Sequence, residues 1–152
     1  MSLRLTLALD KPDLQSINHM NPVARLENRG KKPLSAVIHA TPLSHGEYSI
    51  EVQDARGRPV RLNAIEMCGM MSPLMEHEIF IVEPGASVDL PIHPGNIDPI
   101  PPGSYRVRVT YRAHTSDFHK DNWTPVVKDR LRHFWTGTLS SDWIPFTIRP
   151  TA

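Results

Sequence analysis

The clearest pattern of hydrophobic and polar positions lies in residues 103 to 112. Hydrophobic and polar residues alternate there, and successive side chains of a strand point to opposite faces. The pattern therefore predicts a strand with one buried and one solvated face. The buried face would carry Tyr105, Val107, Val109 and Tyr111, and the solvated face would carry Arg106, Arg108 and Arg112.

Shorter runs of the same kind recur along the chain, and turn residues separate them. Pro accounts for 15 of the 152 residues, about twice its usual share, and no long run has helical periodicity. We expect Asn28 and Gly30 to supply positive φ angles in one turn and residues 54 to 57 to close a hairpin. Pro145 lacks a backbone donor, which indicates an edge strand or a bulge. The predicted strands cover residues 3–9, 23–28, 34–40, 47–53, 58–65, 78–83, 86–92, 103–112 and 144–148.

One segment near the end departs from the strand pattern. Thr124 and Pro125 match a helix N-cap followed by proline at the first helical position. Val127, Leu131 and then Phe134 or Trp135 follow at helical spacing, and Gly137 would close the helix. This predicts one short helix at about 125–134, before the last strand.

The region from residue 100 to 112 resembles the penultimate-strand region of immunoglobulin-like and fibronectin type III-like domains. These domains have a turn, a Gly-x-Tyr step and then alternating apolar residues, and the tyrosine hydroxyl hydrogen-bonds back across the corner. Gly103 and Tyr105 match those positions. The resemblance and the strand pattern predict an all-β fold: a single immunoglobulin-like antiparallel β-sandwich domain, residues 1–152, of about nine strands. The cysteine pair of antibody domains is absent.

A second resemblance is to bacterial proteinase-inhibitor domains of the BsuPI type. YSIEVQDARGRPV, EPGASVDL and IPPGSYRVRV follow the same order of strand, Asp-x-x-Gly hairpin, Pro-Gly turn and Gly-x-Tyr strand. This resemblance implies an inhibitory loop exposed on the sandwich.

Charge and cysteine content narrow the classes of function. The 17 basic residues nearly balance the 16 acidic ones, so the chain has no global field of the kind that attracts nucleic acid. Cys68 is the only cysteine and cannot form an intramolecular disulfide. No apolar run is long enough to span a bilayer, and the start of the chain lacks the features of a signal peptide. We expect a soluble protein, either cytoplasmic or, where a leader has been removed, periplasmic or extracellular.

The first candidate for chemistry is a segment of soft metal ligands. Thioether, thiolate and imidazole groups are the ligands that Cu(I) prefers. Methionines in an irregular segment also pack against the open edge of a sandwich, and that alternative stays open. The segment contains Met67, Cys68, Met70, Met71, Met75 and His77.

The second candidate is the excursion from residue 114 to 136, where aromatic rings lie beside carboxylate and amide groups. Such groups bind carbohydrate or peptide when a rigid sandwich presents them on loops. In the alternative, the tryptophans cover one end of the core. His114 and His119, with Asp117 between them, also have a spacing that permits a metal site. The predicted ligand-binding residues are Phe118, His119, Asp121, Asn122, Trp123 and Trp135.

The third candidate is the face formed by Arg106, Arg108 and Arg112, which suits an acidic partner or a polymer of phosphates or sulfates. The alternative is a solvated strand face with glutamate partners across the sheet. No catalytic motif is present, and no cofactor is predicted. The sequence thus predicts a non-enzymatic recognition or accessory module that binds protein, peptide or glycan through loops at one end. The alternatives are a proteinase inhibitor and a copper-binding protein.

Overall fold

The structure is a computed structural model that describes residues 3–37, 46–61, 76, 79–90, 98–113 and 124–150. Strands dominate this part of the chain, which confirms the all-β class. In chain order the elements are β1 (Leu3–Leu9), β2 (Asp13–Leu14), the 3-10 turn η1 (Ile17–His19), β3 (Pro22–Asn28), β4 (Leu34–Val37), β5 (Gly46–Asp54), β6 (Pro59–Val60), β7 (Ile79–Val82), β8 (Ser87–Leu90), β9 (Gly103–Ala113), α1 (Pro125–Arg130), the 3-10 turn η4 (Leu131–His133), β10 (Gly137–Ser140) and β11 (Ile144–Ile148).

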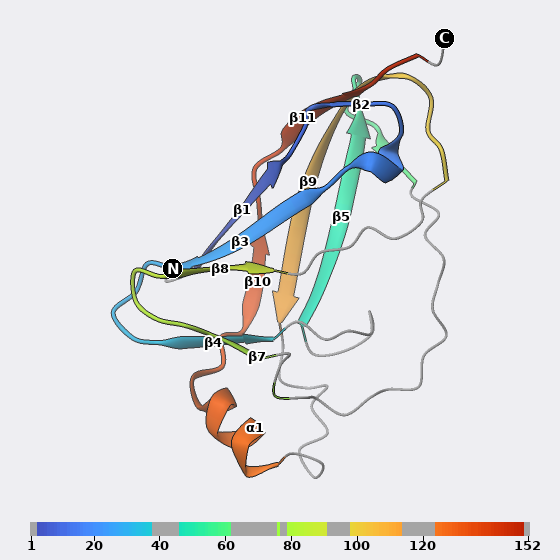
Figure 1. The fold of residues 1–152 in the computed structure, drawn as a ribbon. Helices are drawn as coiled ribbons and strands as arrows, with labels where there is room; N and C mark the ends of the chain where they lie inside the picture. Colours follow the sequence, from blue (N-terminus) through green and yellow to red (C-terminus); the bar gives the residue numbers. More distant parts are fainter. Residues whose placement is uncertain are drawn as a thin grey trace.

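The strands form two stacked sheets and a small third one. The first sheet has the order β1-β3-β8, and the second has the order β2-β11-β9-β5-β6 with β10 also paired to β9. Strands β4 and β7 form a separate pair beside α1 (Figure 1). All pairs are antiparallel except β2 with β11. In Figure 1 the sheet of β1, β3 and β8 lies in front of β9 and β5, which is the layering of a β-sandwich.

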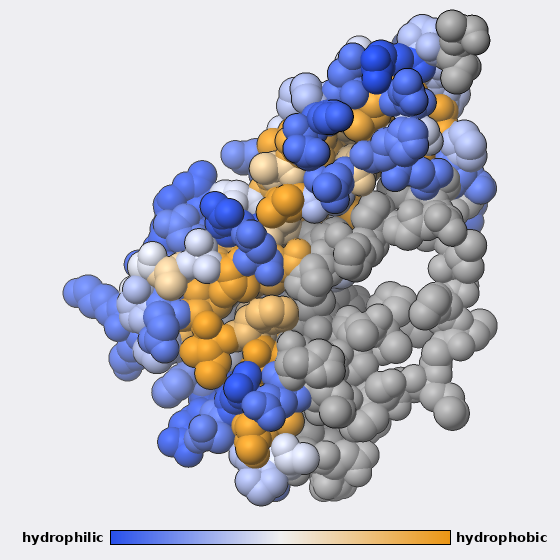
Figure 2. All heavy atoms as spheres, in the orientation of Figure 1, coloured by the Kyte–Doolittle hydropathy of each residue, from blue (hydrophilic) through white to orange (hydrophobic). Residues whose placement is uncertain are grey.

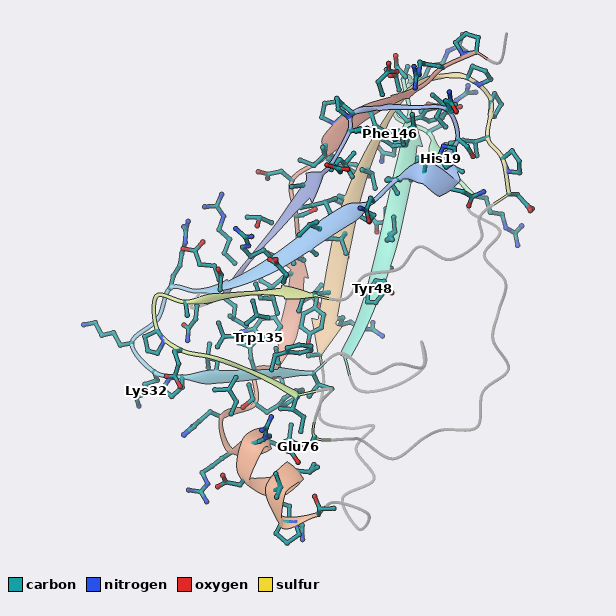
Figure 3. All side chains as sticks on the ribbon, in the orientation of Figure 1. His19, Lys32, Tyr48, Glu76, Trp135 and Phe146 are labelled. Carbon is teal, nitrogen blue, oxygen red and sulfur yellow. The ribbon has the colours of Figure 1, made fainter. Side chains whose placement is uncertain are left out.

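The core lies between the two sheets and follows the alternation in the sequence. Val107, Val109 and Tyr111 of β9 are buried, as the pattern predicts, and Tyr105 is half-buried. Leu26 of β3 is buried in the same core cluster. In the side-chain view, Phe146 lies toward the β2 end of the molecule and Trp135 toward the β4 end (Figure 3). Figure 2 shows hydrophilic residues over the upper end and the left side of the described part and hydrophobic residues gathered through its middle.

The start of β9 has the predicted corner. The Tyr105 hydroxyl donates a hydrogen bond of 2.6 Å to the carbonyl oxygen of Pro101, four residues earlier. Gly103 has a φ of 150°, a conformation that side-chain-bearing residues rarely adopt. The hydrogen bond expected at this corner is therefore present, and the immunoglobulin-like assignment stays a prediction.

Helix α1 begins as predicted, with the Thr124 side chain accepting a hydrogen bond from the Val127 amide at 3.3 Å. It ends at Arg130 and continues as the turn η4 to His133. Val127 and Leu131 pack on Val37 and Ile79, so the helix covers the β4-β7 pair. Two strands, β10 and β11, follow the helix, whereas the sequence predicted only one.

The turn after β3 differs from its prediction. Neither Asn28 nor Gly30 has a positive φ. The Asn28 side chain is buried instead and closes the turn by hydrogen bonds, including one of 2.9 Å from the Gly30 amide to its Oδ1. The turn between β7 and β8 does contain a positive φ, at Gly85.

Candidate functional site

The candidate site begins with an interruption in the strand that pairs with β9. Strand β10 pairs with residues 110 to 113 and β11 pairs with residues 103 to 107, so the chain bulges between them. At the bulge the Ser141 amide donates to the Val109 carbonyl at 2.9 Å, and Ser141 Oγ accepts from the Val109 amide at 3.0 Å. The backbone of β9 at Val109 therefore keeps its hydrogen bonds beside an irregular neighbour.

The bulge places Trp143 on the outer face of the sheet. Phe146 and Ile148 of β11 are buried, so the alternate positions Trp143, Pro145 and Thr147 face outward. Thr147 donates its backbone N–H toward β2. The backbone nitrogen of Pro145 faces the same side of β11 as the Thr147 amide. Pro145 precedes Thr147 and Ile148, the two residues of β11 that pair with β2. This position fits a residue without a donor and agrees with the edge alternative predicted for Pro145, whereas the bulge lies before it, between Ser140 and Ile144.

Two arginines of β9 hold the outward-facing indole. The guanidinium carbons of Arg106 and Arg108 lie 4.7 and 4.6 Å from the centroid of a Trp143 ring, within the range of cation–π attraction. We call Arg106, Arg108 and Trp143 the arginine–tryptophan cluster. The Trp143 side chain is half-buried, so part of the indole remains open to solvent.

Strand β5 supplies the second support of the cluster. In the antiparallel register, Gln53 is opposite Arg106 and Glu51 is opposite Arg108. Arg106 Nε donates to Gln53 Oε1 at 2.7 Å, and Arg108 forms an ion pair with Glu51. The Arg108–Glu51 ion pair is the cross-strand glutamate contact that the solvated-face alternative predicts. Arg106 is bonded to a neutral amide, so its positive charge is not cancelled by that partner.

An open hollow of about 440 Å³ lies beside the cluster. Arg106 and Pro145 belong to its wall, so the hollow and the cluster form one continuous surface. The remaining wall comes from the β5-β6 hairpin and from the start of β9. The hollow is lined by Asp54, Ala55, Arg56, Gly57, Ser104, Tyr105, Arg106 and Pro145.

The hairpin beside the hollow is held by the Asp54 carboxylate. Asp54 Oδ1 accepts hydrogen bonds from the amides of Arg56 and Arg58 at 2.9 and 3.0 Å, and Gly57 adopts a φ of 77°. This confirms the hairpin predicted at residues 54 to 57. The hydrogen bond from the Arg58 amide is the largest cause that lowers the pKa of Asp54, and the nearby Arg58 charge adds to it.

The Asp54 turn predicts a pH-dependent stability of the hairpin. Because its folded pKa is lowered, Asp54 stabilises the fold above the unfolded value of about 4, and this contribution is lost as the pH falls through the folded value. Asp54→Asn should therefore show a smaller fall in Tm below about pH 4 than the wild type. Thermal unfolding monitored by circular dichroism measures this. Asp142→Asn, at an exposed residue, is the control, and an equal acid response of all three proteins would contradict the role of Asp54.

The structure places only part of the predicted site residues. Phe118, His119, Asp121, Asn122 and Trp123 lie outside the described residues, so their role stays a prediction. The same holds for the predicted copper segment, Met67, Cys68, Met70, Met71, Met75 and His77.

Trp135 is buried rather than presented to solvent. Its residue is 9% exposed, and its ring stacks on Tyr111 with centroids 6.1 Å apart. Its amide donates to the Ser35 carbonyl at 2.9 Å, which ties it to β4. An indole with so little exposed area offers no face to a ligand, and the observation favours the core-covering alternative for this residue. Helical spacing offered Trp135 as a residue of the helix face. The helical turns end at His133, so Trp135 lies beyond them.

The sequence interpretation overlooked Trp143, although a signal was present. Ile144, Phe146 and Ile148 share one face by alternation, which assigns Trp143 and Pro145 to the other face. A tryptophan on the solvated face of a strand is unusual and marks a candidate binding surface. Arg106 and Arg108 were predicted on the outer face of β9, where the structure has them. Arg112 is also exposed there, opposite Glu47.

Comparisons of the sequence with protein-family models and with curated proteins find no match. In the part of the chain that the structure describes, no group of three histidine, cysteine, aspartate or glutamate side chains is arranged to hold a metal ion. None of the described helices combines the length and the apolar character that crossing a membrane requires.

Proposed function

We propose that this chain is a non-enzymatic recognition module that binds an acidic peptide segment of a partner protein through the arginine–tryptophan cluster and the adjoining hollow. The observation that carries the proposal is the partly exposed Trp143 ring beside two guanidinium groups on a sheet face. Tryptophan and arginine dominate the energetic centres of protein interfaces.

The order of the side chains supports this proposal. Binding costs free energy when long side chains lose rotamer freedom, and Gln53, Glu51 and the indole already restrain both arginines. A partner would therefore meet a surface that is largely fixed in advance. Strands also position side chains more precisely than loops do.

The charge of the surface supports an acidic partner. The cluster and the turn at residues 54–58 carry four arginines, whose nearby carboxylates are Asp54 of the turn and Glu51 across the sheet. Arg106 keeps its charge beside Gln53, and Arg56 forms no ion pair with any described residue. The hollow is open and lined by both polar and apolar groups, which suits side chains of an extended peptide better than an enclosed small molecule.

The test is selection of a phage-displayed peptide library on the immobilised protein, followed by titration of the enriched peptides. We expect acidic sequences to be enriched and their binding to weaken as salt is raised. Trp143→Ala should weaken binding by about 30-fold or more, which corresponds to an interface residue worth about 2 kcal/mol. The matched control is Arg25→Ala, which removes an exposed, ion-paired arginine from the outer face of the other sheet and should leave binding unchanged.

Circular dichroism of each variant separates loss of binding from loss of fold. Enrichment that persists in Trp143→Ala, or no enriched peptide at all, would contradict the proposed site. A glycan array probed in parallel tests the other partner class. If the protein binds glycans in a Trp143-dependent way and binds no peptide, the partner is a glycan and the peptide proposal is wrong.

A further inference from the structure

Strand β1 has one paired side and one side with no backbone partner in the described part of the chain. All seven of its residues pair with β3 in a continuous antiparallel register, from Leu3 with Asn28 to Leu9 with Pro22. The sheet order makes β1 an edge strand (Figure 1). The backbone hydrogen bonds found outside strand pairs in the described residues include none from residues 3 to 9.

The other strands at the ends of the two sheet orders are short or carry proline, although β5 also has a side without a described backbone partner from Gly46 to Glu51, beyond its two pairs with β6. Strands β2 and β6 have two residues each, and β6 begins with Pro59. Strand β8 has four residues. Proteins commonly protect exposed edges by such shortening, by proline or by bulges, because an open edge can pair with another strand. Strand β1 is seven residues long and has neither a proline nor a bulge.

We infer that β1 pairs with β1 of a second copy of this chain, antiparallel and with Leu7 on the two-fold axis. Any such pairing must keep the buried leucines of both copies on the core face, because a slip of one residue turns every side chain to the opposite face. Only registers centred on a residue meet this condition. The two sandwiches would then share one extended sheet in an isologous dimer.

Charge selects one register among these. Arg4 and Asp10 are both exposed, and neither forms an ion pair with a described residue. With Leu7 on the axis, Arg4 of each copy faces Asp10 of the other, and Thr6 faces Ala8. Arg4 and Asp10 are six residue steps apart along the extended chain of one copy, about 20 Å, so the two side chains cannot pair within a single chain. The edge is therefore complementary to itself only between two copies.

The test exchanges the two charges and measures association by sedimentation velocity over a concentration series. The wild type should show a monomer–dimer equilibrium, and Arg4→Asp or Asp10→Arg alone should weaken it about tenfold or more, because each places like charges opposite one another. The double variant Arg4→Asp, Asp10→Arg should restore dimerisation to near the wild-type level. Arg61→Asp, an exposed change next to β6 in the other sheet, is the control and should have no effect.

A mixture of the two single variants gives the sharpest result. Each variant repels itself, but in a mixed dimer both contacts join an arginine to an aspartate, so the heterodimer should form more tightly than either homodimer. A wild type that stays monomeric at the highest concentration overturns the inference. A dimer that is indifferent to the exchanges, or single variants that do not pair with each other, overturns it as well. Both changes are at exposed residues, and circular dichroism verifies that the fold is retained.

Discussion

Replacing Asn28 by alanine is expected to lower the free energy of unfolding by about 3 to 5 kcal/mol, because three backbone groups lose their partner at once. Asn28 is fully buried at the end of β3. Its Nδ2 donates to the carbonyls of Lys32 and Val82, both at 2.8 Å, and its Oδ1 accepts from the Gly30 amide at 2.9 Å. Urea unfolding of wild type and variant measures the loss.

Asn28→Asp separates the hydrogen bonds from the volume of the side chain. The change keeps the shape and the acceptor toward Gly30, but it sets a carboxylate oxygen against the Lys32 and Val82 carbonyls. Burial among acceptors raises the pKa of such a carboxyl, so the protonated form is the one that folds well. The destabilisation should therefore grow as the pH rises above about 4. Exposed Asn21→Asp is the control, and a cost below about 1 kcal/mol for Asn28→Ala would contradict this role of Asn28.

Asn28 also illustrates what local sequence signals can and cannot give. An asparagine two residues before a glycine marks a turn, and the turn is present after β3. Its mechanism depends on Val82, which is 54 residues away along the chain. The Asn28 amide and carbonyl also bond to Ala86 and Gly85, beyond the end of β7. The spacing of residue types along the chain does not predict such contacts between residues that are far apart in sequence.

The parts of the fold that follow from alternation were predictable. Strands β1, β3, β5, β8 and β9 lie where the pattern of hydrophobic residues indicates them, because one face of each meets the core. The corner at Tyr105 and the hairpin at Asp54 were also predictable, since their hydrogen bonds span at most four residues.

The candidate site was predictable only in its separate components. Alternation assigns Arg106 and Arg108 to the outer face and, applied to β11, would assign Trp143 to the same face of the sheet. That the indole reaches both guanidinium groups depends on the bulge at Ser141, which shifts the pairing between β10 and β11. A bulge is set by the match of two strands about 30 residues apart, so the sequence of one strand cannot specify it.

Tyr111→Phe is expected to cost about 2 to 4 kcal/mol of stability, although it removes a single oxygen atom. The Tyr111 hydroxyl donates to the Val37 carbonyl at 2.6 Å and accepts from the Val37 amide at 3.1 Å. Tyr111 and Val37 are fully buried, so no water replaces the hydroxyl and two backbone groups stay without a partner. Burial raises the pKa of Tyr111, so the hydroxyl keeps its proton and this stabilisation persists through neutral and mildly alkaline pH.

Tyr105→Phe is the matched control, because it removes the same atom from the same strand where the acceptor, Pro101, is exposed to water. Its cost should stay near 1 kcal/mol or below. Amide hydrogen exchange adds a local measurement, since the Val37 amide should lose protection in Tyr111→Phe beyond what the global change explains. Equal costs for the two tyrosine variants would mean that the Val37 contacts add nothing beyond an ordinary solvated hydrogen bond. Unequal costs with selective exchange at Val37 would establish that Tyr111 joins β4 to the second sheet, and with β4 the helix that packs on it.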